Sequence, residues 1–138
     1  MMSVETLLTA TRGSLPQVPG YRLQALLGHG GMGVVYAAVA EHSESLVAVK
    51  LLRSEMATPA NLARFDRERR ILEQLNHPDI ARLLDSGQTR DGSPYLVIEY
   101  VEGRTIVDHC DGESLELRER VRLMRQVCAV VAEAHDQG

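Results

Sequence analysis

The 138-residue chain is short of several features that would point to a class of protein directly. It has two cysteines, Cys110 and Cys128, whose spacing fits neither a metal site nor a disulfide framework, so we expect both to be reduced. No apolar run approaches the roughly 20 residues of a membrane-spanning helix, and the first residues lack the charged-then-apolar pattern of a secretion signal. We therefore expect a cytoplasmic segment, and an anchor elsewhere in the protein stays open.

The chain also lacks a basic tract. Its formal net charge is -4, and arginines such as Arg67, Arg69 and Arg70 alternate with acidic residues, so nucleic acid is not an expected partner. The sequence contains no internal repeat. With 44% hydrophobic and 25% charged residues, the composition is that of one ordinary globular domain.

Patterns of apolar and turn-forming residues predict an ordered arrangement of strands and helices after a flexible leader. Short links between the first three strands favour an antiparallel meander. Thr58 and Pro59 are typical of a helix start, and His77 with Pro78 is typical of a helix stop. The predicted segments are a leader over 1–20, strands over 21–28, 33–40, 46–52, 80–86 and 95–100, and helices over 58–76, 105–110 and 114–137.

The stretch "LLGHGGMGVVYAAVA" places four glycines within six positions between two of the predicted strands. A dinucleotide-binding fold would open a helix at the last glycine, but Gly33 is followed by a strand-like run, so that fold is not expected. Two interpretations stay open on the glycines alone. They form either a flexible hairpin tip or a loop whose N–H groups approach phosphate oxygens closely.

Strand and helix periodicity predict that a lysine and a glutamate face each other. In "LVAVKLL" Ala48 and Lys50 share one face of the strand. In the following helix Glu68 falls within the arc of Phe65 and Leu72 that would pack on the sheet. An unpaired carboxylate there is costly, so Lys50 is the expected partner. The alternatives are a lysine that reaches solvent and a glutamate at the edge of the apolar arc.

Together, "LGHGGMGVV", "VAVK", "ERRILEQLNHPDI" and "YLVIEYVEG" resemble the N-terminal lobe of bacterial eukaryotic-type serine/threonine protein kinases. The resemblance implies an α+β fold, in which a five-stranded antiparallel sheet with one lateral helix is followed by a hinge and a long helix of an incomplete C-lobe. It divides the chain into the leader 1–20, the kinase N-lobe 21–101, and the hinge with the first C-lobe helices 102–138.

The resemblance also implies roles for particular residues in binding ATP. Lys50 would hold the α- and β-phosphates, and Glu68 would orient Lys50. The flap over the phosphates would consist of Gly28, His29, Gly30, Gly31, Met32 and Gly33, with His29 and Met32 contributing mainly backbone contacts. The residues around the adenine would be Leu27, Val35 and Ala48 as its walls, Ile98 behind it, and Glu99 and Val101 as main-chain hinge contacts.

Three motifs of the kinase pattern are missing from these 138 residues, namely H-R-D-x-x-x-x-N, D-F-G and A-P-E. The first orients the substrate hydroxyl, and the first two bind metal, so we expect Mg²⁺ and a protein substrate only in a complete kinase and no activity from this chain alone. No metal ligands are predicted within it. The alternative function is a standalone nucleotide-binding or regulatory module that docks on a partner kinase.

The last predicted helix is apolar over a wide face, which includes Leu117, Val121 and Met124. A small sheet and one lateral helix cannot cover such a face, so a missing lobe, another chain or self-association must cover it. On the polar side, we expect Glu116–Arg120 and Glu119–Arg122 surface pairs.

Overall fold

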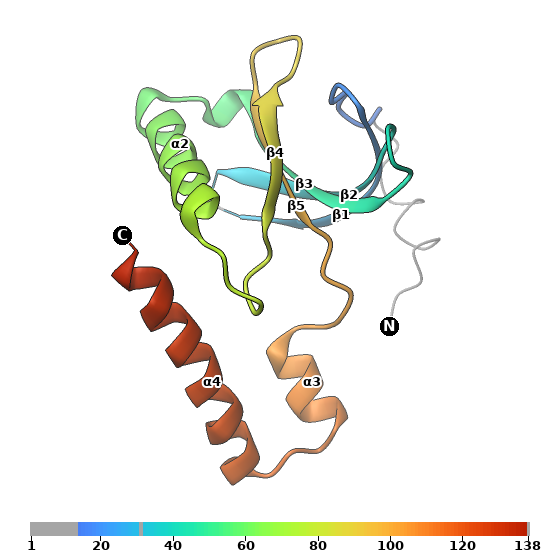
Figure 1. Ribbon diagram of the computed structural model, residues 1–138. Coiled ribbons are helices and arrows are strands. Elements are labelled where there is room, and N and C mark those ends of the chain that lie inside the picture. Colours follow the sequence, from blue (N-terminus) through green and yellow to red (C-terminus); the bar gives the residue numbers. More distant parts are fainter. Residues whose placement is uncertain (1–13, 31, 138) are drawn as a thin grey trace.

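The computed structural model describes residues 14–30 and 32–137. Its centre is a five-stranded antiparallel sheet, as predicted (Figure 1). The strand order in the sheet is β1-β2-β3-β5-β4. The strands are β1 (Tyr21–His29), β2 (Gly33–Ala40), β3 (Leu46–Leu52), β4 (Leu83–Gln88) and β5 (Pro94–Glu99). The helices are the 3₁₀ turn η1 (Ser54–Met56), α2 (Pro59–Gln74), α3 (Ile106–Gly112) and α4 (Leu117–Asp136).

The two faces of the sheet have separate cores. Paired residues on neighbouring antiparallel strands point to the same side, and one side carries Val47, Val49 and Val97 in a cluster that also includes Val18 and Tyr21. The sheet is curled, because the Tyr21 hydroxyl at the start of β1 donates to Asp85 Oδ2 on β4, at the opposite edge, over 2.7 Å. The curl encloses this first core.

The second core lies on the other side of the sheet, under α2. Leu52, Leu96 and Phe65 are buried there, with Met32, Met56 and Leu72 packed against them. Phe65 is the buried residue of α2, which therefore rests on the sheet through a narrow contact. The helix starts as predicted, since Thr58 Oγ1 accepts from the Asn61 amide over 3.2 Å and Pro59 occupies the first helical position.

The expected leader is described only from residue 14 onward, and its first thirteen residues lie outside the described residues. Within the described part, Val18 is buried, and its carbonyl accepts from the Tyr21 amide over 3.1 Å. Chain packing on the sheet thus begins before Tyr21.

Two predicted element starts were three residues too early. The fourth strand begins at Leu83 instead of residue 80, because a turn after Pro78 bonds the Ile80 amide to the His77 carbonyl over 3.2 Å. The last helix begins at Leu117 instead of residue 114, because Ser114 adopts a left-handed φ of 52°. The 3₁₀ turn η1 was not predicted.

The expected Glu116–Arg120 and Glu119–Arg122 pairs were also wrong. The Glu119 carboxylate instead accepts from the Glu116 amide over 3.0 Å in a capping box. Arg120 donates to the Leu115 carbonyl over 2.8 Å and to Asp111 Oδ1 over 2.7 Å, which ties α4 to α3. The Glu116 amide and the Leu115 carbonyl lie at the start of α4 and have no backbone partner within the helix. They therefore bond Glu119 and Arg120 in place of the expected side chains.

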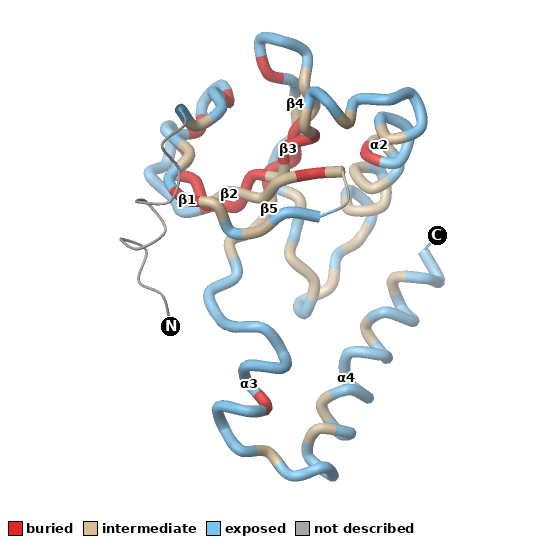
Figure 2. The backbone as a smooth tube through the Cα atoms, turned by 180° about the vertical axis from the view of Figure 1, so that it is seen from behind, coloured by how far each residue is buried: buried red, intermediate tan, exposed pale blue. Residues whose placement is uncertain are grey.

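The predicted wide apolar face of α4 is exposed, as Figure 2 shows by the absence of buried residues along this helix. Leu117 is 77% exposed, Val121 52% and Met124 47%. No described helix is long and apolar enough to cross a membrane.

Candidate functional site: the face of the sheet that carries Lys50

The site is built around an ion pair between the sheet and its lateral helix. Lys50 Nζ on β3 lies 2.8 Å from both Glu68 Oε1 and Oε2 on α2. The two side chains are 25% and 34% exposed, so the pair is partly screened from water but still accessible. The predicted contact is confirmed, and one ammonium faces both carboxylate oxygens, which fixes its direction.

Strand register places the predicted wall residues beside this lysine. Val35 pairs with Lys50, and Ala48 pairs with both Ala37 and Ile98. These residues therefore point to the same face of the sheet as Lys50. Ala48 is buried, whereas Val35 and Ile98 are half-buried. The result is a small apolar surface next to a fixed cation.

The loop between β1 and β2 ends close to Lys50, because Gly33 borders the lysine stem. Its ends are joined by the Gly30 amide, which donates to the Gly33 carbonyl over 2.9 Å. Gly31 lies outside the described residues. Leu27 is 46% exposed, and His29 is also exposed. The Met32 side chain packs against the core under α2. That His29 and Met32 contribute mainly backbone contacts to the phosphates stays a prediction.

The described glycines of this loop differ in what surrounds them. A Cβ on Gly33 would lie 3.2 Å from Lys50 Cε, a tight contact with the lysine stem. A Cβ on Gly28 or Gly30 would meet no atom within 4 Å, and neither residue has a left-handed φ. The protein itself therefore leaves room for side chains at Gly28 and Gly30. Because glycine has no side chain, a ligand can approach the loop backbone at these two positions.

The segment after β5 follows the strand end beside Ala48. The Glu99 carboxylate accepts from the Arg82 amide over 3.0 Å and lies 3.6 Å from the Arg82 guanidinium, so this side chain is bound to the residue just before β4. Val101 is 71% exposed. Among the described residues, no backbone hydrogen bond involves Val101. Its N–H and C=O are thus available to a ligand, and the main-chain contact stays a prediction.

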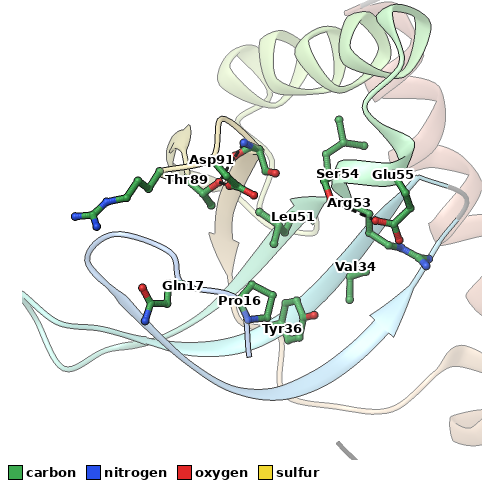
Figure 3. A pocket seen from close by; sticks show the side chains of 13 residues that line it. Pro16, Gln17, Val34, Tyr36, Leu51, Arg53, Ser54, Glu55, Thr89 and Asp91 are labelled. Carbon is green, nitrogen blue, oxygen red and sulfur yellow. Dashed lines mark hydrogen bonds between the residues drawn. The ribbon is translucent and has the colours of Figure 1, made fainter. Parts of the chain in front are cut away.

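A separate hollow of about 540 Å³ has a floor that includes Val34, Tyr36 and Leu51 (Figure 3). These residues alternate with Val35 and Lys50 along β2 and β3 and so point to the opposite face. None of its lining residues belongs to the predicted site. This hollow is therefore distinct from the predicted site.

In the described part of the chain, no group of three or more His, Cys, Asp or Glu side chains could hold a metal ion. The face of the sheet around Lys50 offers one cation, an apolar wall and free backbone groups. These features fit the phosphates and the base of a nucleotide.

Comparison with known protein families shows to which family this chain belongs. Residues 21–138 match the family model described as "Protein kinase domain", and the chain belongs to this family. It is 36% identical over 120 residues to serine/threonine-protein kinase pkn3 of Myxococcus xanthus. The aligned region covers 86% of this chain and 22% of that protein.

Other bacterial relatives give the same result. The chain is 35% identical over 124 residues to serine/threonine-protein kinase PknB of Mycobacterium leprae, covering 86% of this chain and 20% of that protein. It is 34% identical over 117 residues to serine/threonine-protein kinase PrkC of Bacillus subtilis, covering 83% and 18%. The chain spans about a fifth of the length of these relatives.

Proposed function

We propose that this chain is the ATP-binding part of a serine/threonine protein kinase. The observation that carries the proposal is the bidentate contact of Lys50 with Glu68, which holds a partly exposed ammonium on the same face as Val35 and Ala48. Because this ammonium is already held in place, the lysine side chain loses little further conformational freedom when it binds phosphates.

Each part of a nucleotide has a counterpart on the face of the sheet that carries Lys50. Val35, Ala48 and Ile98 would contact the flat apolar base, and Val101 would hydrogen-bond its edge through the main chain. Gly28 and Gly30 would leave the loop backbone open to the phosphates. In a complete kinase, Mg²⁺ would screen the phosphates and the γ-phosphoryl group would pass to a protein hydroxyl.

For these 138 residues by themselves, we propose nucleotide binding without phosphoryl transfer, because the sequence contains no H-R-D, D-F-G or A-P-E motif. The standalone regulatory module is less well supported. Such a module needs a polar outer surface to remain monomeric. Here Leu117, Val121 and Met124 on α4 are exposed, and this supports self-association or coverage by further protein.

The test is a titration of the chain with ATP alone, compared between the wild type and Gly28→Ala. A methyl group at residue 28 meets no protein atom, so we expect an unfolding free energy within about 0.5 kcal/mol of the wild type, as for ordinary surface changes. It would obstruct the phosphates, so the ATP affinity should fall several-fold. Val34→Ala, on the opposite face, is the control and should retain affinity.

If Gly28→Ala and Val34→Ala bind ATP as well as the wild type, the phosphates do not approach this loop. The proposal would then fail.

A further inference from the structure

His77 connects two parts of the fold that otherwise touch little. It lies three residues after the end of α2 at Gln74, and its Nε2 atom is 3.0 Å from Glu133 Oε2 on α4. The His77 side chain is 18% exposed. α4 has no buried residue of its own among those described, so this polar contact is a defined attachment of α4 to the part of the chain that contains the sheet.

The hydrogen bonds of His77 determine which ring nitrogen carries the proton. The Asp79 backbone amide lies 3.0 Å from Nδ1, and a backbone N–H can only donate. Nδ1 therefore accepts and carries no proton. In the neutral ring the proton is then on Nε2, which donates to the Glu133 carboxylate. One side of the ring is fixed by the chain turn after α2 and the other side by α4.

We propose that His77 is a positioning residue, which in this tautomer ties α4 to the C-terminal end of α2 and so restrains the helix that carries Glu68. Among the described residues of α2 only Phe65 is buried, and Leu72 near its end packs against the same core while only partly buried, so the last turns have few other restraints. Glu68 precedes Gln74 by six residues, which is about 9 Å along a helix. A displacement of α4 would thus be transmitted to the Lys50–Glu68 pair.

Two substitutions separate the two hydrogen bonds of His77. In His77→Asn, the amide oxygen can replace Nδ1 as the acceptor for Asp79, but no group reaches Glu133. In His77→Gln, the amide nitrogen can replace Nε2 as the donor to Glu133, so the attachment of α4 is retained. Glu133→Ala removes the acceptor, and Gln126→Ala, at an exposed position of the same helix, is the control.

The measurement is hydrogen–deuterium exchange of the 138-residue chain, followed separately in α2, α4 and the central strands. We expect His77→Asn and Glu133→Ala each to raise exchange about three- to tenfold in the C-terminal half of α4 and in the last turns of α2. The double variant should add nothing further. His77→Gln and Gln126→Ala should resemble the wild type, and amides of β3 and β5 should keep their protection in all variants.

Nitrogen-15 NMR of His77, at a pH of about 8 where an ordinary histidine is neutral, should show a protonated Nε2 and an unprotonated Nδ1. The proposal is overturned if the other tautomer is found, if His77→Gln behaves as His77→Asn does, or if α4 loosens while α2 does not. Neither readout requires a nucleotide. A chain that fails to bind ATP would contradict the proposed function and leave this result untouched.

Discussion

The strength of the Lys50–Glu68 pair can be predicted from its geometry. At 2.8 Å, two unit charges attract by about 6 kcal/mol at an effective dielectric constant of about 20 and by about 1.5 kcal/mol in bulk water. The side chains are 25% and 34% exposed, which places the pair between these limits. Desolvation and side-chain ordering oppose the attraction. We therefore expect a net coupling of about 1–2 kcal/mol in the free energy of unfolding.

The assay is a double-mutant cycle of Lys50→Met and Glu68→Gln, measured by urea unfolding with circular dichroism. The matched control is the Arg22–Glu44 pair, with Arg22→Met and Glu44→Gln. Its charged atoms lie 2.9 Å apart, but its side chains are 54% and 68% exposed. Because water screens exposed pairs, the control coupling should be much smaller. A Lys50–Glu68 coupling no larger than the control would refute the reasoning.

Two further predictions concern the curl of the sheet and the exposed helix. Tyr21→Phe removes the hydrogen bond to Asp85 and should lower the unfolding free energy by about 1–2 kcal/mol in thermal or urea unfolding. Burial, with the Asp85 contact, raises the pKa of Tyr21, so the wild type should lose stability as the pH rises above about 10, the unfolded value, and Tyr21→Phe should lose less. Met124→Glu should reduce self-association in sedimentation experiments, because it places a charge on the apolar face of α4, whereas Gln126→Glu should leave it unchanged.

The sheet and the ion pair could be predicted because each rests on a local pattern. Alternation along "LVAVKLL" determines the direction of Lys50, and helix periodicity determines that of Glu68. Only the order of elements was then needed to bring the two together. The same local patterns gave the start of α2 at Thr58 and Pro59.

Other features depend on contacts between residues far apart in the sequence. The curl that joins Tyr21 to Asp85 spans 64 residues, and no periodicity marks it. The packing of Met32 under α2 was missed because a side chain at a loop tip carries no pattern. The contact between His77 and Glu133 was also missed, since His77 with Pro78 is fully accounted for as a helix stop.

The central claim is that the face of the sheet that carries Lys50 binds a nucleotide. The most direct test is a titration of the isotope-labelled chain with ATP, followed by NMR at backbone amides and methyl groups. The account predicts the largest shifts at Gly28, Val35, Ala48 and Val101, with Val47 and its cluster on the opposite face unaffected. Shifts centred on that opposite face, or none at millimolar ATP, would contradict it.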